Sequence, residues 1–301
     1  IIFKKYYNTI IMKDLIVSKK YDNKKLSKLL METYSALKFS TFSKALKKKD
    51  ILINDKRISK DCIIHENDII KLYIIDSLLY PNYNIPIVYE DSNIIVFNKP
   101  KGLEVTGTES LTTYVHKTYN SNFMPCHRLD RNTLGLVLFS KNDTVNTILT
   151  EKFKNHEIEK HYIAKVYGML PKKNDTLIHY LFKDTKKSIV YISDKCKPGY
   201  KKIITSYNVL SYDKEENSSV LDINLKTGRT HQIRAHLAYI GHPIIGDGKY
   251  GNNLINKKFN QKTQLLYSYY LKFNFKSYSG ILDYLNNKEI ILDKLPSFKK
   301  I

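Results

Sequence analysis

Two clusters of charged side chains, far apart in the chain, contain the residue types that covalent or acid–base chemistry needs. The first is the sequence HRLDR at 127–131, in which Asp130 is the one carboxylate among basic neighbours. The second is the run 226–237, where an alternating apolar segment ends at Gly228 and a helix is predicted to start with Thr230 as its N-cap. Taken separately, each cluster is typical of an exposed charged turn, whose ion pairs stabilise a fold only weakly.

The second cluster suggests a partner for the first. On the predicted helix, Arg234 lies on the same face as His231 and Ala238, three and four residues away. A partly buried arginine at the start of a helix needs a carboxylate partner, and Asp130 is the candidate. A single carboxylate held in this way suits a nucleophile or a base, whereas a glycoside hydrolase normally uses two carboxylates.

The hydrophobic pattern predicts the elements that position these clusters. Short segments rich in branched and aromatic residues predict strands at 85–89, 94–98, 136–140, 162–167, 203–207 and 220–225. Apolar residues at helical spacing predict a helix over 144–153, after Asn142 and Asp143 as cap residues. We therefore expect an α+β fold with a mixed, largely antiparallel sheet and few helices.

Residues 26–75 read as a separate small unit of two helices followed by short strands. Its second helix is rich in lysine, and the turn after the next strand contains Asn54 and Asp55. This order resembles the small alpha-L RNA-binding motif. A charged helix is also typical of a solvated surface, so the motif is weak when taken alone.

Composition favours a polyanionic partner and argues against several protein classes. The 50 Lys and Arg exceed the 29 Asp and Glu, giving a formal charge of +21 that favours nucleic acid, although codon bias toward lysine explains part of it. Three isolated cysteines indicate neither disulfides nor a zinc site and fit a cytoplasmic protein. The longest apolar runs are too short for a membrane span. The sequence has neither a Rossmann fingerprint nor a P-loop, so no cofactor or metal is expected.

Several segments, in order, resemble the motifs of the RluA family of RNA pseudouridine synthases. They are NKPKGL at 98–103, HRLD at 127–130 with Thr133 and Gly135, KHYIAKV at 160–166 with Gly168, GRTHQIR at 228–234 with His236, and 241–251. The resemblance covers about residues 84–275. Departures occur at Leu134, Ser140, Thr106-Gly107 and Tyr267-Ser268, none of which touches the positions matched to the catalytic residues.

The resemblance implies isomerisation of uridine in RNA, with Asp130, Tyr162 and Arg234 as catalytic residues. The N1–C1′ bond breaks, the uracil turns, and C5 joins C1′ without a cofactor. Arg234 would keep Asp130 ionised in a dry pocket, because desolvation alone would neutralise the carboxylate. Asp130 would act either as a nucleophile at the sugar or as the base that gives a glycal. Tyr162 would stack on the uracil and take part in proton transfer at C5.

The resemblance also implies a set of substrate-binding residues. Arg128 would hold the place of the flipped base, and His127 would orient the loop. Arg229 and Gln232 would contact the RNA backbone or base edges, and Lys99 would line the pocket or bind phosphate. For these side chains a purely structural role is an equal alternative.

The domain organisation follows from the same motifs. We interpret 1–12 as an extension upstream of a natural start at Met12, with the end of a targeting segment as the alternative. Residues 13–76 are predicted to form a small α+β RNA-binding module, 77–86 a linker, and 87–301 the catalytic domain of pseudouridine-synthase type.

A module in this position favours large-subunit ribosomal RNA over transfer RNA as the substrate of a monomeric enzyme. The alternative from another class is a non-catalytic RNA-binding or ribosome-assembly protein on the same fold.

Overall fold

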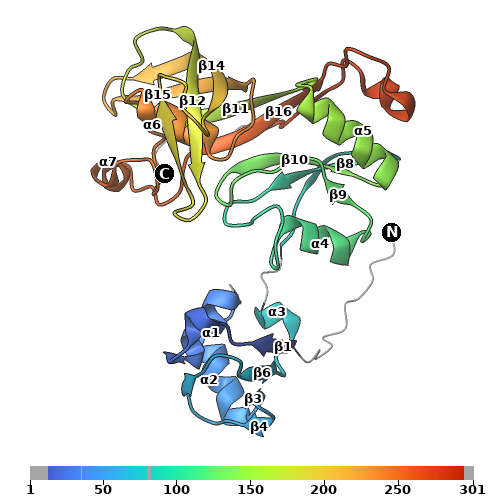
Figure 1. Cartoon of the computed structure of the whole chain (residues 1–301), viewed down its shortest axis with the longest axis vertical. Coiled ribbons are helices and arrows are strands. Elements are labelled where there is room, and N and C mark those ends of the chain that lie inside the picture. The colour runs from blue at the N-terminus through green and yellow to red at the C-terminus, as the bar shows by residue number, and fades with distance from the viewer. Residues whose placement is uncertain (1–12, 35, 80–82, 295–301) are drawn as a thin grey trace. The chain divides into compact units, whose positions relative to one another are not determined.

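The computed structural model describes residues 13–34, 36–79 and 83–294 (Figure 1). The chain folds as two compact units, 1–84 and 85–301. The predicted extension at 1–12 lies outside the described residues. Within the described part of the chain, no helix is both long and apolar enough to cross a membrane.

The small unit packs two helices against a four-stranded sheet of order β1-β6-β3-β4. Its elements are β1 (Lys13–Ile16), η1 (Lys19–Tyr21), β2 (Lys24–Lys25), α1 (Leu26–Thr33), α2 (Phe39–Lys48), β3 (Ile51–Ile53), β4 (Lys56–Arg57), β5 (Ile63–Ile64), β6 (Ile69–Leu72) and α3 (Asp76–Leu79). Leu26 and Leu30 of α1 and Phe42 of α2 are fully buried against Ile51 and Ile70 of the sheet. The helical spacing of these apolar residues explains why both helices form here.

The predicted linker 77–86 starts too early. Residues 76–79 form the short helix α3, and Leu79 is fully buried in the core of the small unit. An apolar side chain that completes a core belongs to that unit, so the prediction is corrected: the connection between the units begins after Leu79.

The large unit is built on one eleven-stranded sheet, with the path β13-β12-β14-β15-β11-β16-β10-β8-β7. Its strands are β7 (Ile87–Glu90), β8 (Ile94–Lys99), β9 (Met124–Pro125), β10 (Leu134–Ser140), β11 (Ile158–Tyr167), β12 (Asn174–Asp184), β13 (Ile189–Ser193), β14 (Lys201–Asp213), β15 (Ser218–Leu225), β16 (Leu266–Phe273) and β17 (Glu289–Ile291). All neighbours are antiparallel except β10 and β16, which pair in parallel. The expected mixed, largely antiparallel α+β fold is confirmed.

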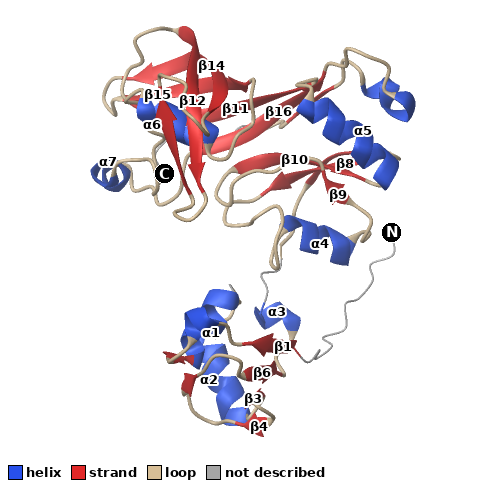
Figure 2. Cartoon of the chain, in the orientation of Figure 1, coloured by secondary structure: helices blue, strands red, loops and turns tan. Residues whose placement is uncertain are grey.

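The helices of the large unit fall into two groups, one beside each end of the sheet (Figure 2). They are α4 (Leu111–Thr118), α5 (Asp143–Lys154), α6 (Gln232–Tyr239), α7 (Asn253–Lys258) and η2 (Gly280–Leu285). Helix α5 buries Val145 and Leu149 against β8 and β10, while Ala235 of α6 packs on Ile203 of β14. This packing fixes the loops before β10 and before α6, where the two charged clusters lie.

The start of α6 differs from the prediction. The helix begins at Gln232, and its N-cap is His231 in a left-handed conformation with φ 53°, without a side-chain cap hydrogen bond. The side chain of Thr230 therefore does not cap this helix. The left-handed turn points the His231 ring toward the first charged cluster rather than along the helix.

Candidate active site

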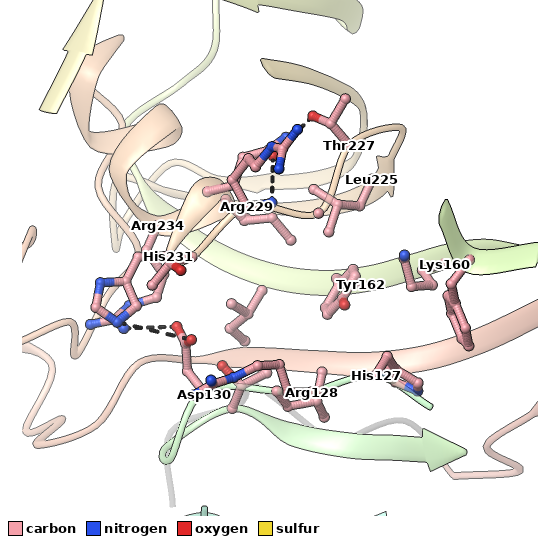
Figure 3. Close-up of a pocket in the computed structure, with 18 of the residues that line it drawn as sticks. His127, Arg128, Asp130, Lys160, Tyr162, Leu225, Thr227, Arg229, His231 and Arg234 are labelled. Atoms are coloured by element: carbon pink, nitrogen blue, oxygen red, sulfur yellow. Dashed lines mark hydrogen bonds and ion pairs between the residues drawn. The ribbon is translucent and has the colours of Figure 1, made fainter. Parts of the chain in front are cut away.

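A pocket of about 430 Å³ lies where the loop before β10, the strand β11 and the loop before α6 meet (Figure 3). Asp130 and Arg128 come from the first of these segments, and Tyr162 and Lys160 come from the second. The third supplies residues 227–234. The structure therefore brings together side chains that are widely separated in the sequence.

Asp130 and Arg234 are in direct contact. The Nη1 of Arg234 donates to Oδ2 of Asp130 over 2.8 Å, and 24% of the Asp130 side chain is exposed. The other carboxylate oxygen, Oδ1, lies 4.0 Å from Nε2 of His231. One oxygen of Asp130 is thus held, while the carboxylate stays accessible from the pocket.

A second carboxylate, Asp247, holds the opposite edge of the same guanidinium. Nε and Nη2 of Arg234 donate to its two oxygens over 2.7 and 3.0 Å. Asp247 is fully buried, and the backbone N–H groups of Lys249 and Tyr250 also donate to it. Sequence reasoning missed this residue, although an arginine has five donors and one partly exposed carboxylate cannot satisfy them all.

Pairing between Arg234 and Asp247 keeps both side chains charged. Burial alone would lower the pKa of Arg234, but Asp247 and Asp130 raise it above its ordinary value. Burial likewise opposes ionisation of Asp247, and the hydrogen bonds from Arg234 overcome it and lower the pKa of that carboxyl. The guanidinium therefore stays charged and presents a fixed donor to Asp130.

Tyr162 forms a buried wall of the pocket. Only 5% of the residue is exposed, and it stands opposite Ser268 across the β11–β16 pair. Burial and the negative charge of Asp130 raise the pKa of its phenol, and the Ser268 hydroxyl opposes this rise. The phenol therefore remains protonated at neutral pH and presents a flat ring together with a donor.

His127 is tied to the scaffold, whereas Arg128 and Arg229 are exposed and line the pocket. Nε2 of His127 accepts a hydrogen bond from the backbone N–H of Leu138 over 3.1 Å, and its ring centroid lies 4.9 Å from that of Phe153. Burial, followed by the charge of Lys160, lowers the pKa of His127 to about 3. A neutral histidine used as an acceptor fits the expected role of orienting the loop.

Lys99 is not among the residues that line the pocket, so the expectation that it does is wrong, and its binding of phosphate stays a prediction. The residue is fully buried and does not line the pocket. Its ammonium donates to the carbonyl oxygens of Pro100, Leu103 and Arg131 over 2.7–3.1 Å. These hydrogen bonds therefore hold the backbone of the loop that contains Asp130.

Gln232 lines the pocket, and its side chain is held by hydrogen bonds within the protein. Its oxygen accepts from the Thr227 hydroxyl and from the backbone N–H of Arg229, and its nitrogen donates to Ile204 and Thr205. The side chain is 2% exposed, so its polar atoms are already used by the protein. It fixes the loop that presents Arg229, and its contact with RNA stays a prediction.

His231 and Tyr250 were not predicted to lie at the site. Nδ1 of His231 is 2.8 Å from the Tyr250 hydroxyl, which also accepts from the backbone N–H of Val190. The Arg234 guanidinium lies 5.3 Å from the centre of the Tyr250 ring. In the described residues, no group of three or more His, Cys, Asp or Glu side chains could hold a metal ion.

Comparison with known proteins gives consistent matches. A family model described as RNA pseudouridylate synthase matches residues 93–239. An uncharacterised RNA pseudouridine synthase of Mycoplasma capricolum is 33% identical, covering 93% of this chain and 97% of that protein. The ribosomal large subunit pseudouridine synthase C of Buchnera aphidicola is 31% identical over 79% of this chain and 81% of its own. The structure of human RNA pseudouridylate synthase domain containing 1 aligns with a TM-score of 0.59 at 23% identity, covering 72% of this chain and 86% of that one, and supports the fold.

Proposed function

This chain belongs to the RluA family of RNA pseudouridine synthases, and we propose that it isomerises uridines in large-subunit ribosomal RNA with Asp130 as the reacting carboxylate. The observation that carries the proposal is that Asp130 is the one acidic residue lining the described pocket. A two-carboxylate hydrolase is disfavoured for the same reason. The name of the Buchnera relative supports ribosomal RNA as the substrate.

The geometry supports different roles for Arg234 and Asp130. Arg234 holds Oδ2 of Asp130, so Oδ1 is the oxygen presented to the substrate. That oxygen either attacks C1′ as N1 leaves or removes the C2′ proton to give a glycal. In the first route C5 displaces the Asp130 oxygen from C1′, and in the second C5 bonds to C1′ as the proton returns to C2′. In both routes the C5 proton then leaves and N1 gains a proton, so nothing is oxidised or reduced.

Tyr162 and Arg128 complete the proposed site. The buried ring of Tyr162 provides a stacking surface for uracil, and its protonated hydroxyl is placed for proton transfer. A uridine in a helix or loop must leave its stack to reach this pocket, and we expect the exposed Arg128 to occupy the space that the base leaves. We propose that the enzyme acts as a monomer. The three free cysteines are in keeping with a cytoplasmic protein.

Replacement of Asp130 tests the reaction. We expect Asp130→Asn and Asp130→Ala to abolish pseudouridine formation and to leave RNA affinity within about threefold, because the carboxylate acts on the sugar and not on the phosphate backbone. The measurement is tritium release from transcribed large-subunit ribosomal RNA carrying [5-³H]uridine, since the C5 hydrogen is lost in the reaction. Filter binding of the same RNA is the control.

Two outcomes would contradict the proposal. Undiminished tritium release by the Asp130 variants would remove Asp130 from the reaction. If the unaltered protein acted on transfer RNA transcripts and not on ribosomal ones, the assigned substrate would be wrong.

A further inference from the structure

The pocket continues beyond Tyr162 to a second end whose side chains the reaction does not use. Lys160 lies two residues before Tyr162 on β11, and both side chains line the pocket. The Lys160 ammonium lies 5.0 Å from the centre of the Phe153 ring. It also approaches Gly228 across the pocket, where a Cβ would be 3.8 Å from Nζ. The ammonium therefore stands inside the pocket, between two of its walls (Figure 3).

Charges near Lys160 are positive. The pKa of His156 is lowered by burial and then by the charges of Lys160, Arg229 and Lys276. The pKa of His127 is lowered by burial and by Lys160. Asp130, the carboxylate that lines the described pocket, is hydrogen-bonded to Arg234 at the other end. At the second end of the pocket Lys160 and Arg229 are cations, and no carboxylate among the described residues lines this end.

Lys160 itself is desolvated without an anionic partner among the described residues. Burial lowers the pKa of its amine to about 8. A cation removed from water without a partner destabilises the protein that contains it. Such an arrangement is expected where the partner arrives with the ligand. RNA brings phosphate groups at every nucleotide, and these are the usual partners of lysine and arginine in such complexes.

We propose that Lys160, Arg229 and His156 form a phosphate subsite that binds the phosphodiester flanking the target uridine. This inference rests on the proposed function, because it requires RNA in the pocket. Because Lys160 and Tyr162 line the same pocket two residues apart on β11, the ammonium is close enough to bind the phosphate of a nucleotide whose uracil stacks on the tyrosine. The subsite would fix the position of the nucleotide, leaving the bond changes to Asp130.

The test compares Lys160→Met and Lys160→Arg with the unaltered full-length protein. The substrate is transcribed large-subunit ribosomal RNA with [5-³H]uridine, and kcat and KM are measured from low to high salt. We expect Lys160→Met to raise KM about tenfold at low salt, as the removal of a charge-assisted hydrogen bond should, with kcat much less affected. Its plot of log(kcat/KM) against log salt concentration should be shallower by about 0.7 in slope, because one phosphate is no longer neutralised by the protein. Lys160→Arg should restore both values.

Lys214→Met is the matched control. Lys214 is an exposed residue in the turn between β14 and β15 and does not line the pocket. The substitution removes the same charge from the molecule, and we expect it to leave the salt slope unchanged.

The inference is overturned if Lys160→Met lowers kcat but keeps the salt slope of the unaltered protein, because Lys160 would then contact the uracil and not a phosphate. An equal change in slope for Lys214→Met would also overturn it, since the effect would come from net charge alone. If the unaltered protein released no tritium from this RNA, the proposed function would fail instead. The two failures are therefore distinguishable.

Discussion

Arg234 serves two carboxylates that differ in burial and in role. Asp247 is fully buried and takes two of its donors, whereas Asp130 is partly exposed and takes a third. The inner pair stabilises the charge of the arginine, and the outer hydrogen bond orients the carboxylate that faces the pocket. The arginine is thus a structural residue toward one neighbour and a positioning residue toward the other.

Truncation of the arginine should therefore affect stability as well as rate. We expect Arg234→Ala to lower the free energy of unfolding by about 3–5 kcal/mol, because it leaves Asp247 buried without its partner. Urea denaturation measures this loss. Asp130→Asn is the matched comparison and should cost much less, since Asp130 is partly solvated. Similar losses for the two variants would show that Asp247 does not depend on Arg234.

His236 should make stability depend on pH. It is fully buried, with Nδ1 2.9 Å from the Thr205 hydroxyl and Nε2 2.7 Å from His179, which pairs with Asp194. Burial and His179 lower its pKa from 6.5 to about 4. Between those values the unfolded chain binds a proton that the native protein does not, so stability falls as pH drops, by about 1.4 kcal/mol per pH unit.

Urea denaturation at several pH values between 4 and 7 checks this expectation. His236→Gln removes the titrating group and should flatten the curve in that window. A variant curve as steep as that of the unaltered protein would assign the dependence to other groups, with His127 the next candidate.

Sequence alone predicted the Asp130–Arg234 pair but not the hydrogen bonds that Lys99 and Gln232 make within the protein. The helical spacing around Arg234 and the need of a partly buried arginine for a carboxylate predicted this pair without knowledge of the fold. Whether a polar side chain in a motif faces a ligand or a backbone carbonyl depends on the fold around it. Lys99 and Gln232 both face the protein, and each fixes a loop of the site.

At the scale of elements, the junction between β10 and β16 holds the two parts of the sheet together beside the pocket. It consists of two residue pairs in parallel, Leu134 with Tyr267 and Gly135 with Ser268. Gly135 has φ 112°, and a Cβ there would lie 1.9 Å from the carbonyl oxygen of Ser268. Only glycine permits this close approach five residues after Asp130.

We expect Gly135→Ala to lower the free energy of unfolding by about 3 kcal/mol or more, because backbone strain and a backbone clash add together. Gly102→Ala is a matched control, since Gly102 also has positive φ, at 82°, but no atom within 4 Å of a Cβ. It should cost only about 1–2 kcal/mol. Thermal and urea unfolding of both variants measure the loss of stability. Equal losses would show that the close approach of Gly135 to Ser268 does not add to the cost of the substitution.

The sequence predicted the elements with uninterrupted apolar patterns and missed others. Strands such as β8 and β10 are buried on both faces, so their apolar runs are unmistakable. Strand β12 has exposed and buried residues in an irregular order, and β13 is a short edge strand, so neither gave a clear signal. The start of α6 was displaced because a histidine adopts the left-handed conformation there.

At the scale of the whole molecule, the charge of +21 is distributed over both units, so RNA affinity is not expected to reside in the pocket alone. The small unit contributes exposed lysines on α2, including Lys44 and Lys48, which are four residues apart and share a face. We propose that this unit is an RNA-binding module, as its order of helices and strands suggests. Because Leu79 belongs to its core, a deletion that ends at 76 would leave part of that core behind.

Substitution within the full-length chain tests the small unit without disturbing the fold. We expect Lys44→Gln with Lys48→Gln to weaken RNA binding, with a salt slope shallower by about 0.7 for each phosphate that the protein no longer neutralises, while kcat at saturating RNA stays unchanged. The double variant Lys257→Gln with Lys258→Gln removes two exposed charges from α7 of the large unit and is the control. Filter binding and tritium release on the same ribosomal RNA separate affinity from catalysis. Unchanged affinity in the α2 variant would mean that this helix face does not bind the substrate, because the removal of two lysines from an RNA-binding surface must alter the salt slope.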